Sequence, residues 1–285
     1  MAKTYFLKNH IDKVDALNDQ LWYYLFATEE LNRQLTSFSD KAKENYTTDL
    51  FKSNPHSSRI HVTVSSLPKH QKENKNLTLG AYFATCYEIA AKHIRTSFDT
   101  LKAFNSLTAY SWDGRKEPEK NLLKLLLDEG LPAPDVNITD TITYLRHRRN
   151  HYTHIIETPN PSLAGFLTAT CPRLNTHWRA PGTTIHLDFT KTLVRDFTQE
   201  ETIELIKLLR ICLIEIDEHI AGLLNVNSVI EHLVKREYGT KTVRLNTNTL
   251  QQRLNKIIYI GRTELGLTLT NTQIQPYANT IGVRP

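Results

Sequence analysis

The stretch 198-TQEETIELIKLLRICLIEIDEHIAGLLN-225 decides the fold class of this chain. It opens on Thr198 with Glu201 three residues later, the spacing of a capping box, in which a hydroxyl and a carboxylate satisfy the first free amides of a helix. Apolar residues then recur every three or four positions, as on one buried helical face. They are Ile203, Ile206, Leu209, Leu213, Ile216, Ile220 and Leu223. The stretch therefore predicts a long helix packed against a core.

Two other long segments carry the same periodicity, so we expect them to pack against this helix. In residues 10–38 the repeating positions are Val14, Leu17, Leu21, Tyr24, Thr28, Leu31, Leu35 and Phe38. In residues 78–105 they are Tyr82, Phe83, Cys86, Ala90, Ile94, Phe98 and Leu101. We interpret His93, near the apolar side of the second segment, as a hydrogen-bonded core histidine rather than a catalytic one.

Two shorter helices are predicted between the long ones. One covers residues 119–129 and ends at Gly130, a residue that commonly terminates helices. The other runs from a cap at Thr139 or Asp140 to about residue 157.

Two short apolar alternations suggest strands that pair with each other. They are Ile60, Val62 and Val64, and Ile185, Leu187 and Phe189. The chain is therefore expected to be mostly α, a four- to five-helix bundle with short β additions.

Charge divides the chain into two parts. Residues 226–285 carry eight lysines or arginines against three acidic residues, whereas residues 1–225 are balanced, and the whole chain has a net charge of +5. We therefore expect a helical domain over 1–225 and a basic C-terminal extension over 226–285, with a helix near 248–260. A basic extension attracts phosphates without reading sequence, although dispersed charges also simply keep a segment solvated.

The overall composition is that of an ordinary globular protein, with 40% hydrophobic and 23% charged residues. Three widely separated cysteines form neither a CxxC pair nor a disulfide framework, which favours a reducing compartment. No stretch has the length and hydrophobicity of a signal peptide or a membrane span. We expect a cytoplasmic protein that does not associate with membranes.

The densest polar cluster is 144-YLRHRRNHYTH-154, inside the helix predicted over 140–157. On an ideal helix, Arg149 shares a stripe with Ile138, Ile142, Leu145, Tyr152 and Ile156. Because an unpaired buried charge is costly, Arg149 is expected to meet an anion or a carboxylate, or to lie in a wet interface.

These residue types suit RNA cleavage. A guanidinium can bind two phosphate oxygens, and a histidine can move the proton of a ribose 2′-hydroxyl or of the leaving oxygen. No metal or other cofactor is needed, since RNA carries its own nucleophile.

The pattern Leu145-Arg146-x-x-Arg149-Asn150-x-x-x-His154 resembles the signature of the HEPN family. The resemblance implies a motif near the start of a late helix in a four-helix bundle, and a homodimer whose two motifs form one cleft. It further implies a metal-independent endoribonuclease leaving 2′,3′-cyclic phosphate ends, often a toxin or phage-defence effector with an antitoxin or sensor as partner. Arg149 and His154 take the catalytic positions, and Asn150 orients them.

A second frame, Arg146-His147-x-x-x-His151, has the same spacing and overlaps the first. We prefer the frame that contains Asn150, and expect Arg146, His147, His151 and Tyr152 to line the substrate cleft. The family resemblance also includes a subgroup with a tyrosine two residues after the motif histidine, which a partner nucleotidyltransferase modifies. Ile156 stands there instead, so that regulation is not expected.

Other functions find less support in the sequence. His147, His151 and His154 have helical metal-ligand spacing, but the arginines among them and the lack of an HExxH arrangement oppose a zinc site. The chain contains no phosphate-binding loop, nucleophile elbow or dinucleotide fingerprint. The main alternative is a non-catalytic helical adaptor that binds RNA or a protein through the basic extension.

Overall fold

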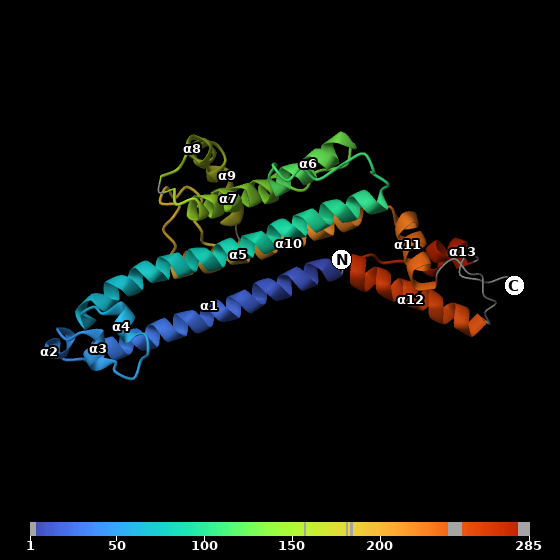
Figure 1. Ribbon diagram of the computed structural model, residues 1–285. Coiled ribbons are helices and arrows are strands. Elements are labelled where there is room, and N and C mark those ends of the chain that lie inside the picture. The colour runs from blue at the N-terminus through green and yellow to red at the C-terminus, as the bar shows by residue number, and fades with distance from the viewer. Residues whose placement is uncertain (1–3, 157, 181, 183–184, 239–246, 279–285) are drawn as a thin grey trace.

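The computed structural model describes residues 4–156, 158–180, 182, 185–238 and 247–278. These residues form thirteen α-helices and one 3-10 helix, with no β-strand among them (Figure 1). The mostly helical fold is therefore confirmed. The helices of the main body are α1 (Tyr5–Ser37), α5 (Leu67–Phe104), α6 (Pro118–Asp128), α7 (Val136–Thr153) and α10 (Gln199–Leu223).

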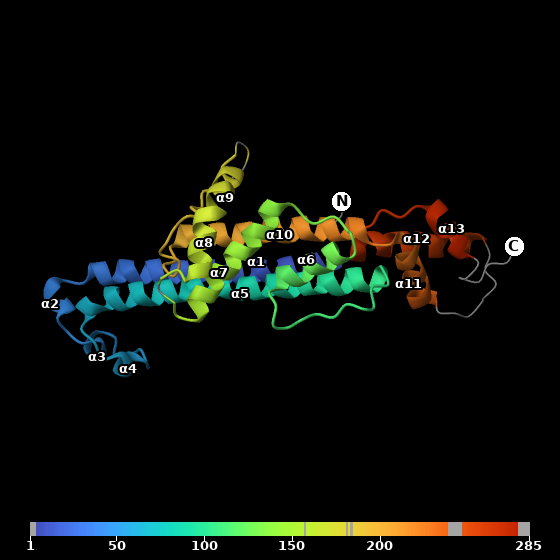
Figure 2. The same ribbon diagram turned by 90° about the horizontal axis from the view of Figure 1, so that it is seen from above.

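Helix α5 is the centre of the main body, because α1, α6, α7 and α10 all pack against it. Its 38 residues span about 57 Å at ~1.5 Å per residue. Figures 1 and 2 show α1, α5 and α10 running side by side, with α6 and α7 lying over α5. The face predicted for 78–105 is buried except for the half-buried Tyr82, with Phe83, Cys86 and Leu101 wholly inaccessible.

At one end of the body, α1 and α5 extend beyond the other long helices and are joined by short ones (Figure 1). These are α2 (Asp40–Lys43), α3 (Thr47–Leu50), α4 (Ser57–Ile60) and the 3-10 helix η1 (Val64–Ser66). The strand predicted over 60–64 is wrong. Ile60 ends α4, His61 turns the backbone into the left-handed region (φ 35°), and Val64 starts η1. Backbone pairing here is limited to an antiparallel bridge between Tyr46 and Thr63, with the amide of Thr47 donating to the carbonyl of Val62 at 2.9 Å and that of Val64 to the carbonyl of Asn45 at 3.0 Å.

The second predicted strand is also wrong as a strand, although its alternation is real. Ile185, Leu187 and Phe189 are buried in the core, but within the described residues their segment pairs with no strand. Side chains take the place of a strand ladder: the amide of Phe189 donates to Asn175 Oδ1 at 3.0 Å, and that of His186 to Glu204 Oε2 at 3.1 Å. The apolar alternation therefore indicated which side chains are buried, and not that the segment pairs with a strand.

Two helices that the sequence did not predict lie between α7 and this segment: α8 (Pro161–Ala169) and α9 (Cys171–Trp178). Each has a proline in its first turn, where the missing amide hydrogen costs nothing. Pro161 and Pro172 therefore stand where helices start.

The extension forms three helices at the other end of the body: α11 (Val226–Tyr238), α12 (Thr247–Leu265) and α13 (Asn271–Ala278). Helix α12, which contains the predicted helix 248–260, packs against α1, and α11 contacts α5 (Figure 2). Each acidic residue of the extension is bound to a base: Glu231 to Lys235, Glu264 to Arg236, and Glu237 to both Arg236 and Lys256.

Among the described residues, no helix combines the length and hydrophobicity needed to cross a membrane. The three cysteines are free thiols buried in α5, α9 and α10. Burial raises the pKa of Cys86 and Cys171 to about 12 and also raises that of Cys212. At neutral pH all three are therefore thiols rather than thiolates.

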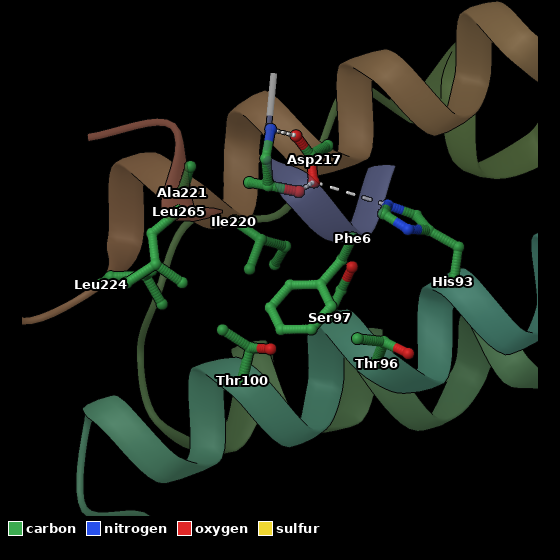
Figure 3. Close-up of a pocket in the computed structure, with 11 residues that line it drawn as sticks. Phe6, His93, Thr96, Ser97, Thr100, Asp217, Ile220, Ala221, Leu224 and Leu265 are labelled. Atoms are coloured by element: carbon green, nitrogen blue, oxygen red, sulfur yellow. Dashed lines mark hydrogen bonds and ion pairs between the residues drawn. The ribbon is translucent and has the colours of Figure 1, made fainter. Parts of the chain in front are cut away.

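A buried polar cluster ties the start of α1 to α5 and α10. The backbone amide and the hydroxyl of Thr4 donate to the carboxylate of Asp217 at 3.1 and 2.6 Å. His93 Nε2 lies 3.6 Å from the same carboxylate, beside a cavity of about 20 Å³, the size of roughly one water (Figure 3). His93 is a core histidine as expected, but within the described chain neither ring nitrogen forms the expected hydrogen bond.

This cluster makes stability depend on pH. Burial, followed by the charge of His10, lowers the pKa of His93 to about 3, and burial also lowers that of His10. The nearby Asp217 carboxylate favours a charged imidazole, but it is already bound by Thr4, so burial dominates. In the unfolded chain these histidines take up protons near pH 6.5, whereas in the folded chain they stay neutral at that pH. Their contribution to the unfolding free energy is therefore fully present above pH 6.5 and decreases as the pH falls.

We expect the unfolding free energy, measured by urea denaturation, to fall by about 2 kcal/mol through His93 between pH 7 and pH 5. The variant His93→Gln should show a flatter dependence over this range. An identical pH slope in both proteins would show that His93 does not control it.

Candidate functional site

The polar segment 144–154 lies in the second half of α7. This helix begins earlier than predicted, at Val136, where Asp135 rather than Thr139 or Asp140 caps it by accepting from the amide of Asn137 at 2.7 Å. It also ends earlier, at Thr153. The candidate motif therefore occupies the last turns of a helix, not the region near a helix start that the family resemblance implies.

Arg148, not Arg149, is the fully buried arginine of the segment. Its side chain is inaccessible, and its Nη1 donates to Glu201 Oε1 at 2.6 Å and to the Tyr144 hydroxyl at 3.0 Å. Its Nε donates to the carbonyl of Val194 at 2.7 Å. Lys191 also binds Glu201, at 2.7 Å. Arg148 thus joins α7 to the start of α10 and to the segment before it.

The apolar stripe expected for this helix includes Arg149 and not Arg148, but α7 has neighbours on several sides. It packs against α5 and α6 as well as against α9 and α10, so a single apolar stripe does not describe its buried surface. Glu201 was expected to complete the capping box, yet only half of that motif forms. The Thr198 hydroxyl accepts from the amide of Glu201 at 3.2 Å, while the Glu201 side chain turns to Arg148 and Lys191.

Arg146 is also held inside the protein. It is 9% exposed, and its Nε donates to Glu119 Oε1 at 2.7 Å, with Glu117 3.5 Å away. Both acids come from the beginning of α6 or the residue before it. Sequence reasoning missed these partners, because nothing local marks a carboxylate 27 residues away as a contact.

His147 and His151 are buried as well. The Nδ1 of His151 donates to the carbonyl of His147 at 2.8 Å, because its Nε2 must accept from the amide of Asn160 at 3.3 Å. Both ring nitrogens are therefore occupied within the protein. Burial, followed by the charge of Arg146, lowers the pKa of His147 to about 4. Arg146, His147 and His151 were expected to line an open cleft, but all three are buried and bound within the protein.

Tyr152 fixes the end of α7 on α5. Its hydroxyl donates to the carbonyl of Leu77 at 2.8 Å. Its ring lies so close to Gly80 that a Cβ there would come within 2.4 Å of two ring carbons. Glycine is thus required at this crossing. Tyr152 is an anchor between helices, and it also lines an open groove of about 510 Å³ together with residues of α1 and α5.

Arg149, Asn150 and His154 remain at the surface. The Arg149 side chain is 28% exposed and forms an ion pair with Glu88 of α5. Its Nη1 donates to Asn150 Oδ1 at 2.9 Å, while its buried Nε has no hydrogen-bond partner among the described residues. Of the alternatives expected for Arg149, an anion, a carboxylate or a wet interface, the structure shows a carboxylate, that of Glu88.

His154 sits just beyond α7 as its C-cap. The amide of Ile156 donates to the carbonyl of His151 at 3.0 Å and that of Ile155 to Tyr152 at 3.3 Å, the two bonds of a Schellman motif. Ile155 adopts φ 55° at the position that usually holds glycine, which is strained for a β-branched residue. The turn places His154, an exposed residue, at the end of the helix.

The geometry does not gather metal ligands. His151 uses both ring nitrogens within the protein, so His147, His151 and His154 do not form a common site. Across the described part of the chain, no three histidine, cysteine, aspartate or glutamate side chains are grouped so that they could hold a metal ion.

Comparison of the chain with protein-family models, with curated proteins and with solved structures found no match. The likeness to the HEPN family therefore rests on the residues between Leu145 and His154.

The two neighbouring arginines should respond differently to substitution. Arg148→Ala leaves Glu201 buried without its main partner and should lower the unfolding free energy by about 3 kcal/mol or more. Arg149→Ala removes a half-exposed ion pair and should cost less than about 1 kcal/mol. Urea denaturation of both variants measures this difference, and an equal loss would place Arg149 among the structural residues.

Proposed function

We propose that this chain is a metal-independent endoribonuclease of the HEPN type. In this proposal it cleaves RNA by attack of the 2′-hydroxyl on the adjacent phosphate, which leaves 2′,3′-cyclic phosphate ends. It acts as a homodimer in the cytoplasm, as a toxin or anti-phage effector controlled by an antitoxin or sensor.

One observation carries the proposal: burial divides the polar segment into two sets. Arg146, His147, Arg148 and His151 are buried and engaged within the protein, whereas Arg149, Asn150 and His154 keep access to solvent. The exposed set is the frame that matches the family motif with its asparagine. The overlapping frame, Arg146 with His151, belongs to the interior.

The exposed residues can divide the chemistry among them. The Arg149 guanidinium would bind the phosphate and stabilise the charge that develops on its oxygens. The Asn150 oxygen holds Nη1 of Arg149 and so orients the guanidinium. His154 would take the 2′-hydroxyl proton or give one to the leaving oxygen.

A second copy of the chain fits this arrangement. Arg149 and His154 are five positions apart, which corresponds to roughly 140° around a helix, and both lie at the surface. In a dimer, the arginine of one copy and the histidine of the other could meet across the interface. This composite site is part of the proposal.

The decisive experiment incubates wild-type protein, Arg149→Ala and His154→Ala with total tRNA in EDTA and maps the product ends. We expect wild-type cleavage with cyclic-phosphate ends, and rates lower by about 10²–10⁴-fold in both variants. Arg59→Ala and His186→Ala, which remove the same side chains at exposed positions elsewhere, should cleave like wild type.

Equal cleavage by all five proteins would reject these residues as the site. A wild-type protein that binds RNA without cutting it, and that loses binding when basic residues of the extension are removed, would support the adaptor. The ion pairs inside the extension argue against that alternative, since they already engage Lys235, Arg236 and Lys256.

A further inference from the structure

A groove with a volume of about 540 Å³ runs along the exposed side of α5 beside the candidate site. Its polar lining comes from one face of that helix and its far wall from the segment before α6. The residues that matter for its chemistry are Glu88, Lys92, Arg95, Asp99 and Trp112.

Glu88 connects this groove to the candidate site. Its carboxylate lines the groove and at the same time forms the ion pair with Arg149. A chain lying in the groove would therefore reach Arg149 at the position that Glu88 now occupies. An anionic group arriving there would take the place of the Glu88 carboxylate as a negatively charged acceptor for Arg149.

The cations of the groove follow Glu88 along the helix. Lys92 is exposed and forms no ion pair within the described residues, and Arg95 comes one turn later, about 4.5 Å further along the axis. The Arg95 guanidinium lies over the Trp112 ring, 5.7 Å from its centre, and its Nε is 4.0 Å from Asp99. Both side chains of that ion pair are about 60% exposed, so solvent screens it strongly.

Lys92 and Arg95 lie beside the Trp112 ring, with the acids Glu88 and Asp99 at either end of the pair. Surfaces that bind single-stranded nucleic acid place phosphates on such cations and a base on such a ring. An unpaired base is needed for such stacking, which favours single strands over a duplex.

We propose that this groove holds the single-stranded RNA substrate next to the cleaved bond. A phosphate displaces Glu88 from Arg149, the neighbouring phosphates lie on Lys92 and Arg95, and a base stacks on Trp112. Glu88 then acts as a gate that RNA must open. The inference rests on the proposed ribonuclease function for its substrate, but the groove can be tested by binding alone.

The test uses a fluorescent single-stranded 2′-O-methyl oligonucleotide, which lacks the nucleophilic hydroxyl and so cannot be cleaved. Affinities of the full chain are measured at several salt concentrations. We expect Lys92→Ala/Arg95→Ala to bind about tenfold more weakly, with a slope of log K against log salt shallower by about 1.4. Trp112→Leu should also bind about tenfold more weakly, and Glu88→Gln severalfold more tightly.

Matched controls lie on the same helix. Lys69→Ala/Lys72→Ala removes two exposed lysines with the same spacing, and Glu73→Gln neutralises another exposed acid. The proposal is overturned if the groove variants bind like these controls, if Glu88→Gln binds no tighter than wild type, or if wild type does not bind the oligonucleotide. Thermal melting of each variant verifies that it is folded.

The two proposals fail in different ways. If Arg149→Ala and His154→Ala cleave like wild type while the groove variants lose binding, the groove stands and the catalytic assignment is wrong. If both variants lose cleavage while the groove variants bind normally, the catalytic assignment stands and RNA reaches it by another path.

Discussion

The Arg148 guanidinium lies inside the protein, where an unpaired charge would cost several kcal/mol of stability. Groups from three segments of the chain surround it. Glu201, Tyr144 and the carbonyl of Val194 accept its hydrogen bonds. Those groups come from α10, from α7 itself and from the extended segment before α10. Removing one partner of a buried ion pair costs much more stability than a surface ion pair contributes. This contact therefore fixes α7 against α10 and determines where the residues after Arg148 reach the surface.

The surface residues of the segment follow from that anchoring. With Arg148 and His151 turned inward and Tyr152 locked against Gly80, the remaining side chains of the last turns face outward. Arg149 then reaches Glu88, and the Schellman turn presents His154 beyond the helix end. The candidate site is thus the exposed remainder of a segment whose other polar residues serve the fold. The division by burial thus separates the residues of the motif that contact solvent from the neighbouring polar residues that hold the fold together.

The long helices were predictable because each repeats an apolar face over many turns, as the residues of α5 and α10 do. The end of α7 was not, since Ile155 adopts a glycine-like conformation that its side chain disfavours. The apolar stripe included Arg149 and not the fully buried Arg148, because α7 is covered from several directions and its burial follows no single stripe. The partners Glu88, Glu119 and Glu201 were missed for a further reason: tertiary packing, not local spacing, brings them to α7. The motif itself stood out because polar residues are so dense there.

The buried cysteines have a practical consequence for the solution behaviour of this protein. Only the thiolate reacts readily with alkylating reagents, and Cys86, Cys171 and Cys212 are held as inaccessible thiols in three different helices. Their modification must therefore wait for the surrounding structure to open. The rate at which each one reacts reports how often its part of the molecule opens, so the native chain carries three built-in probes of local and global unfolding.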